Sequence, residues 1–138
     1  MAASPQFAST PETRIISLAT AGTGNRLNSQ TASAFLLTCA GAGVSGTKVT
    51  QIGGKFQNSN GACSLFIFLS DTGGTTASAL LYDEITFAAT TASASAATVR
   101  SVNAYGDFQL MPGQSIYVSC STATNTTPLN VYISAGDF

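Results

Sequence analysis

The sequence predicts an all-β fold: a single-domain β-sandwich, jelly-roll-like, with about eight strands and an extended N-terminal arm. Three observations lead to this prediction. Short stretches of alternating apolar and polar residues recur along the chain, segments rich in Gly, Asn and Ser separate them, and no long stretch has the apolar period of a helix. A length of 138 residues suits one domain with its own core. We therefore expect an arm over residues 1–11 and a β-sandwich domain over residues 12–138.

The arm and the first four strands are expected in the N-terminal half. Pro5 and Pro11 lack backbone donors and push the residues before them toward extended conformations, which predicts the arm. Gly53 and Gly54 indicate a bulge or a close backbone approach within the third strand. The fourth strand is apolar on both faces, which places it centrally in a sheet. The expected strands cover residues 12–18, 34–39, 47–57 and 63–70.

Four further strands are expected in the C-terminal half. Residues 88–97 contain only Ala, Ser and Thr, which predicts a surface loop, and Pro112-Gly113 indicates a turn. The sixth strand is expected to break at Gly106. The expected strands cover residues 79–87, 99–111, 115–120 and 129–134. Alternation places toward the core Leu81, Ile85, Phe87, Ile116, Val118, Cys120, Val131 and Ile133, and places outward Tyr117 and Ser119.

The low charge of the chain is its largest departure from an average composition. Charged residues make up 8% of the chain, against about 25% in an average soluble domain. The longest apolar run, residues 65–69, is far too short to cross a membrane, and eight Phe and four Tyr argue against disorder. An uncharged surface is a solubility risk for a free monomer, so it favours a subunit covered by its neighbours.

The five basic residues are scattered along the sequence. No run of them could neutralise several phosphates, on which affinity for nucleic acid mainly depends. We therefore expect no direct contact with DNA or RNA and, without a basic amphipathic helix, none with a membrane. These residues are Arg14, Arg26, Lys48, Lys55 and Arg100.

The three cysteines, Cys39, Cys63 and Cys120, lie in apolar or alternating stretches at wide spacings. Cysteine behaves as a small hydrophobic residue in such positions, so we expect three buried free thiols, although one disulfide stays open. The N-terminus has no charged region followed by an apolar one, so we expect no secretory signal and synthesis in a reducing cytoplasm.

Motifs for chemistry are weak, and we expect no enzyme, no cofactor and no metal. The chain has no histidine, which removes the commonest general base and zinc ligand. Residues 41–46 match G-x-G-x-x-G, but the β-branched stretch that follows favours a Gly-rich loop over a dinucleotide site. Asp83 and Glu84 are adjacent and would point to opposite faces of a strand.

The N-terminal segment has two interpretations. It is either a disordered terminus or an arm that pairs with a neighbouring subunit through its main chain. For the second interpretation, the candidate interface residues are Phe7, Pro11, Ile15 and Ile16.

The order of several segments resembles the small virion β-sandwich proteins of tailed bacteriophages, of the capsid decoration (cement) type. The resemblance covers residues 33–138 and is one of pattern. It rests on KVTQI at 48–52, LFIFLSD at 65–71, LLYDEI at 80–85, LMPGQSIYVS at 110–119 and AGDF at 135–138, after a Met-Ala-Ala start.

This resemblance implies a structural subunit on the surface of a phage head, made in the host cytoplasm. It would form a homo-oligomer, with a trimer favoured, and would bridge and stabilise neighbouring major capsid proteins. The alternative is a tail, fibre or receptor-binding β-sandwich module that recognises a host surface glycan through Tyr, Asn and Asp side chains. The absence of Trp, a frequent stacking platform for sugars, favours the decoration protein.

Overall fold

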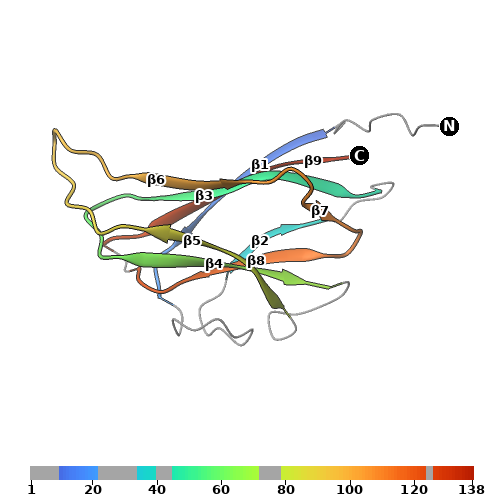
Figure 1. The fold of residues 1–138 in the computed structure, drawn as a ribbon, viewed down its shortest axis with the longest axis horizontal. Helices are drawn as coiled ribbons and strands as arrows, with labels where there is room; N and C mark the ends of the chain where they lie inside the picture. The colour runs from blue at the N-terminus through green and yellow to red at the C-terminus, as the bar shows by residue number, and fades with distance from the viewer. Residues whose placement is uncertain (1–9, 22–33, 40–44, 72–78, 124–125) are drawn as a thin grey trace.

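The computed structural model describes residues 10–21, 34–39, 45–71, 79–123 and 126–138. Within these ranges the chain forms nine strands and no helix, so the predicted all-β class is confirmed. Two antiparallel sheets stack face to face as a single β-sandwich (Figure 1). The strands are β1 (Thr10–Leu18), β2 (Ala34–Thr38), β3 (Thr47–Phe56), β4 (Cys63–Ser70), β5 (Leu80–Phe87), β6 (Arg100–Ala104), β7 (Gln109–Leu110), β8 (Ser115–Cys120) and β9 (Leu129–Asp137).

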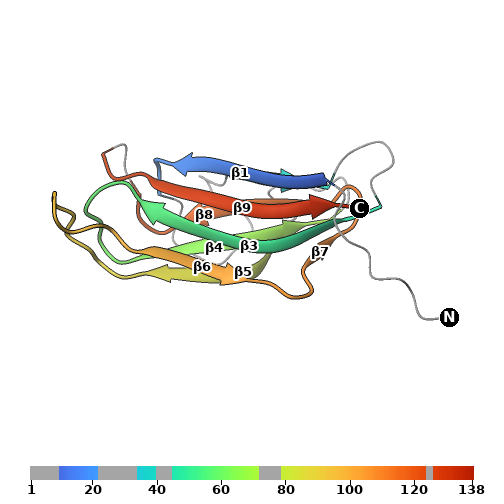
Figure 2. The same cartoon turned by 90° about the horizontal axis from the view of Figure 1, so that it is seen from above.

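The two sheets, here called sheet A and sheet B, each contain strands that are distant in sequence. Sheet A has the order β1-β9-β3-β6, with the short β7 also paired to β3. Sheet B has the order β2-β8-β4-β5, so the predicted central position of β4 is confirmed. Figure 2 shows the strands of sheet A side by side, with sheet B beneath them.

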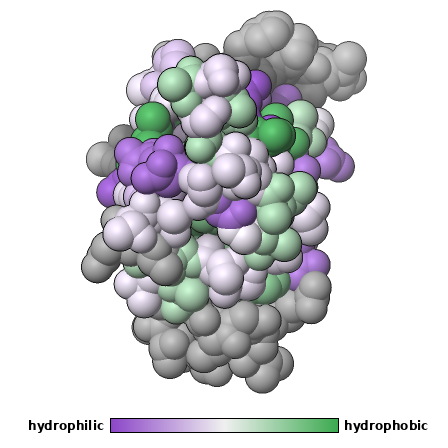
Figure 3. Space-filling view, turned by 90° about the vertical axis from the view of Figure 1, so that its left-hand side faces the viewer, coloured by the Kyte–Doolittle hydropathy of each residue, from purple (hydrophilic) through white to green (hydrophobic). Residues whose placement is uncertain are grey.

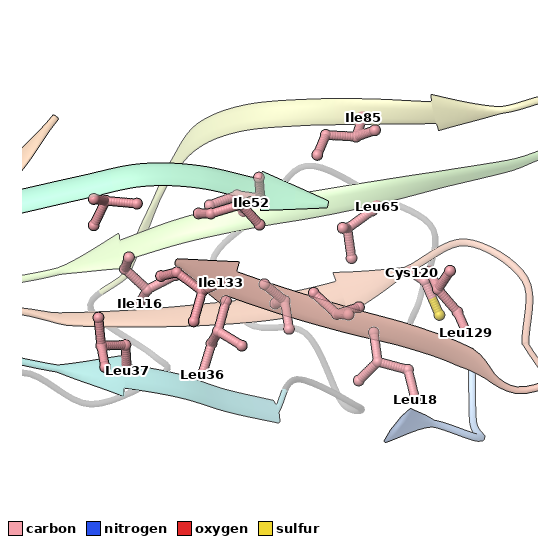
Figure 4. Close-up of a cluster of buried hydrophobic side chains, with 14 of the residues drawn as sticks. Leu18, Leu36, Leu37, Ile52, Leu65, Ile85, Ile116, Cys120, Leu129 and Ile133 are labelled. Carbon is pink, nitrogen blue, oxygen red and sulfur yellow. The ribbon is translucent and has the colours of Figure 1, made fainter. Parts of the chain in front are cut away.

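The core fills the space between the sheets with the inward side chains of both. Ile52 and Ile133 from sheet A meet Leu65 and Ile116 from sheet B, and each is fully buried (Figure 4). Burying one such aliphatic side chain contributes about 1.5–3 kcal/mol. The buried residues predicted from alternation are confirmed at Ile85, Phe87, Ile116, Val118, Cys120, Val131 and Ile133.

Leu81 is a correction, because it is half-buried on the outer face of sheet B and not in the main core. The pairing of β4 with β5 shifts between Ile67 and Phe68, so that Tyr82 is an extra residue in β5. One extra residue in a strand moves the side chains that precede it to the opposite face of the sheet. Leu81 therefore packs with a second cluster that contains Phe66 and Phe68.

Other strand boundaries differ from the expected ones by a few residues. β1 begins at Thr10, so Pro11 is a strand residue in place of the last residue of an arm. The expected strand over residues 99–111 is interrupted at Gly106, as predicted, and becomes β6 and β7. β9 continues to Asp137, because its pairing with β1 and β3 extends beyond the expected end.

The paired glycines of β3 mark a close approach of neighbouring groups. A Cβ at Gly53 would lie 2.8 Å from the Ser101 carbonyl oxygen, which real Cβ atoms do not tolerate. The bulge lies earlier in the strand, where the register with β9 shifts between Val49 and Gln51. The sequence predicted either a bulge or a close approach at these glycines, and the structure has the close approach.

Candidate interface surfaces

The expected arm residues fall in three different environments. Phe7 lies outside the described residues. Pro11 pairs with Gly136 in β9, within the sheet. Ile16 is half-buried and packs against the core of its own chain, whereas Ile15 is 68% exposed on the opposite side of β1. Only Ile15 of this pair is therefore exposed, and the role of the arm stays a prediction.

Ile15 belongs to the outer face of sheet A, to which β1, β9, β3 and β6 contribute alternate residues. Ile15, Tyr132, Gly53 and Val102 lie opposite one another across the four strands and form one row. The ring of Tyr132 lies over Gly53, where a Cβ would come within 2.6 Å of the phenol oxygen. The face consists of Pro11, Thr13, Ile15, Ser17, Lys48, Gln51, Gly53, Lys55, Arg100, Val102, Ala104, Asn130, Tyr132, Ser134 and Gly136.

Lys48, Lys55 and Arg100 give this face its charge, and none of the fifteen residues that form it carries a carboxylate. Lys55 and Arg100 pair directly across two strands, at the end of the sheet where β6 begins. The Lys55 ammonium donates to the Thr98 carbonyl oxygen over 2.5 Å. The Arg100 guanidinium carbon lies 5.9 Å from the centroid of the Tyr132 ring, within cation–π range. Both cations are exposed.

A polar cluster joins the two sheets at their β5–β6 edge. The Asp83 carboxylate oxygen Oδ2 accepts hydrogen bonds from the Tyr105 hydroxyl over 2.7 Å and from the Asn103 amide over 2.8 Å. Its Oδ1 accepts the backbone N–H of Glu84 over 2.8 Å. Burial by itself disfavours the charged carboxylate, but these three hydrogen bonds outweigh it and hold the pKa of Asp83 below its ordinary value.

Three aromatic rings pack beside this carboxylate. Tyr82 stacks on Phe108 with ring centroids 4.1 Å apart, and Tyr105 meets Phe108 edge-on at 5.2 Å. Burial, and then the hydrogen bond to Asp83, raise the pKa of Tyr105 far above its ordinary value, so this hydroxyl stays protonated and donates. The Asp83 carboxylate accepts three hydrogen bonds, and the Tyr105 hydroxyl stays protonated. This arrangement suits a structural link between the two sheets and not proton transfer.

A notch of about 270 Å³ opens beside Tyr82 at the start of β5. Apolar side chains form most of its wall, and Asp71 and Gln114 lie at its rim, where the Gln114 amide donates to Asp71 over 3.4 Å. Within the described part of the chain, no three His, Cys, Asp or Glu residues converge to hold a metal ion. The notch is lined by Leu69, Asp71, Leu80, Leu81, Tyr82 and Gln114.

The three cysteines are buried free thiols, as predicted. Cys63 and Cys120 lie on the neighbouring strands β4 and β8, and the Cys63 thiol donates to the Thr122 carbonyl oxygen over 3.2 Å. A hydrogen bond to Cys63, together with burial, raises the pKa of the Cys120 thiol well above its ordinary value. These thiols serve as core residues.

Sequence reasoning missed the cluster around Asp83, because strand alternation does not reveal which edge strands of two sheets come together. It also missed the exposed apolar side chains of Val99, Val102, Leu80 and Met111. The available signal was an apolar residue next to a charged one at a strand end, as in Val99-Arg100.

The comparisons with known proteins give no identification: no protein-family model matches the chain, and no curated protein matches it in sequence. The described residues contain no helix that is long and apolar enough to span a membrane.

Proposed function

We propose that the chain is a structural subunit of a tailed-phage virion, a decoration (cement) protein that bridges and stabilises neighbouring major capsid proteins on the head surface. In this proposal the chain is made in the host cytoplasm and assembles as a homo-oligomer, with a trimer favoured. The observation that carries the proposal is the pairing order of the strands.

The pairing order supports a jelly roll. β1 pairs with β9, β2 with β8, β3 with β6 and β7, and β4 with β5, so the chain is one long antiparallel hairpin folded over into two sheets. With β6 and β7 counted as one interrupted strand, each sheet has four strands. Jelly rolls of this kind are the architecture of many viral capsid and lectin domains.

The surface supports a role in packing against other subunits. The outer face of sheet A mixes hydroxyl, amide and glycine residues with a few apolar and basic ones, and Ile15 is 68% exposed in one row. Side chains of this kind allow many modest contacts over a broad area, as in standard interfaces that bury about 800 Å² per partner. The fold alone does not fix function, so this face and its contacts are what the experiment must test.

Counting copies in the particle tests the proposal. We expect quantitative mass spectrometry of purified virions to find the chain in hundreds of copies, close to the stoichiometry of the capsid lattice. Particles that lack it should release their DNA at lower temperature, because bridges between capsid subunits resist internal pressure. A chain absent from purified virions would overturn the proposal.

Glycan recognition is a second candidate, which the notch favours. A partly exposed aromatic ring, Tyr82, beside the carboxylate of Asp71 and the amide of Gln114 is a combination that sugar-binding sites use. Binding of the isolated protein to host surface polysaccharide, weakened by Tyr82→Ala, together with only a few copies at the tail tip, would favour this candidate over decoration.

A further inference from the structure

Apart from Ile15, the exposed large apolar residues of the described chain gather at two places on the surface, one basic and one acidic. The first place, here called the basic patch, consists of Lys55, Val99, Arg100 and Val102. Val99 is 64% exposed and Val102 is 37% exposed, on either side of Arg100 in the chain. Lys55 lies directly opposite Arg100 across β3 and β6. The loop before β6 lies at the end of the sandwich that Figure 3 faces, where strongly hydrophobic residues lie near strongly hydrophilic ones.

The second place, here called the acidic corner, consists of Asp71, Leu80, Tyr82, Asp107 and Met111. Leu80, Met111 and Tyr82 are 68%, 67% and 45% exposed. Asp71, Leu80 and Tyr82 line the notch.

Met111 and Asp107 are linked to these residues through their neighbours. Gln114 at the rim accepts the backbone N–H of Met111 over 2.9 Å. Asp107 directly precedes Phe108, whose ring stacks on that of Tyr82 with centroids 4.1 Å apart. Burial and then the negative charge of Asp107 raise the pKa of the Tyr82 phenol. Asp83 and Glu84 follow in β5, and none of the described basic residues lies in sheet B.

The two surfaces cannot meet within one molecule. The acidic corner lies at the start of β5, and the basic patch follows the loop after its end. β5 has 8 residues, so at about 3.3 Å per residue roughly 23 Å separates Leu80 at its start from the end of the strand. β6 begins with Arg100 near that end, since Gly54 lies against Phe87 and pairs with Ser101. In Figure 1 the loop between β5 and β6 lies at the left, and β5 begins toward the opposite end. Each surface can therefore meet its complement only on another molecule.

We propose that the basic patch of one copy docks on the acidic corner of a second copy. Lys55 and Arg100 would face Asp71 and Asp107, while the exposed apolar residues of both surfaces would bury one another. Two basic patches repel each other, and so do two acidic corners, so each contact joins unlike surfaces. Such contacts form reciprocally in a two-fold dimer, or head-to-tail in a ring or a chain of subunits. It goes beyond the proposed function and does not depend on it, since it uses only this chain's own surfaces.

Charge-reversed variants test this contact with the intact protein. Lys55→Glu with Arg100→Glu makes the basic patch acidic, and Asp71→Lys with Asp107→Lys makes the acidic corner basic. We expect wild type to self-associate in sedimentation velocity runs at low salt, and each double variant to be monomeric at the same concentration. Far-UV circular dichroism and thermal melting would establish that each variant is folded. Arg14→Glu, a cation on β1 outside both surfaces, is the matched control and should associate as wild type does.

An equimolar mixture of the two double variants gives the sharpest result. The native basic patch of one variant then meets the native acidic corner of the other, and the two reversed surfaces also match. We expect association to return in the mixture, and the dissociation constant of wild type to rise about tenfold between low salt and 0.5 M salt, because exposed ion pairs are screened. Wild type that stays monomeric at low salt, or folded variants that fail to associate when mixed, would overturn the proposal.

Discussion

The hydrogen bond between Tyr105 and Asp83 should stabilise the sandwich, because it ties the edge strand of sheet B to the edge of sheet A. Tyr105→Phe removes the hydroxyl that donates to Asp83 over 2.7 Å and leaves the ring packed on Phe108. Asp83→Asn removes the negative charge but keeps the size of the side chain. The two variants together with the double variant form a thermodynamic cycle around one bond.

The magnitude follows from the chemistry and the exposure of the pair. A hydrogen bond to a charged group contributes about 1.5–3 kcal/mol. Both residues are half-buried, so solvent reduces this value, and we expect Tyr105→Phe to lower the free energy of unfolding by about 1–2 kcal/mol at neutral pH. For a domain of this size that is a drop in melting temperature of roughly 3–8 °C. The coupling energy in the cycle should be about 1 kcal/mol.

The effect should also depend on pH. The pKa of Asp83 is lowered in the folded state, so its contribution is fully present above the unfolded pKa of about 4 and is lost as pH falls through the folded value. The difference between wild type and Asp83→Asn should therefore shrink in acid. Urea unfolding followed by circular dichroism at pH 7 and at pH 3 measures it. A Tyr105→Phe protein as stable as wild type at pH 7, or a difference that grows in acid, would refute this reasoning.

Three further outcomes follow from the core and the close contacts. Ile133→Ala should lower the free energy of unfolding by about 2–5 kcal/mol in denaturant titrations, because the side chain is fully buried between the sheets; an unchanged midpoint would contradict the packing described. Gly53→Ala should destabilise the protein in a thermal melt, since its Cβ would meet the Ser101 carbonyl oxygen, while Gly61→Ala, whose Cβ meets nothing, serves as control. The three thiols should resist a thiol reagent in the native protein and react together in denaturant, whereas rapid native labelling would contradict their burial.

Much of the fold follows from sequence because alternation reports which face of a strand is buried. Val131 and Ile133 alternate with polar neighbours, and both are fully buried. The run 63–70 is apolar on both faces, and it is indeed an inner strand whose Phe66 and Phe68 fill a second cluster. Local pattern and tertiary packing agree at these positions.

The features that the sequence does not predict depend on strand register and on contacts between the two sheets. A single extra residue at Tyr82 moves Leu81 to the outer face of sheet B. The local sequence pattern does not predict this bulge. The bond from Tyr105 to Asp83 joins residues from two different sheets, so it exists only once the sheets have stacked. The basic patch likewise needs Lys55 beside Arg100, which only the pairing of β3 with β6 provides.

A cryo-electron microscopy reconstruction of the virion that carries this chain tests the central claim most directly. We expect copies of the two-sheet domain on the outer surface of the head, at positions where major capsid proteins meet, repeated with the symmetry of the lattice. A head whose surface density leaves no place for this domain, or density for it confined to the tail tip, would contradict the account.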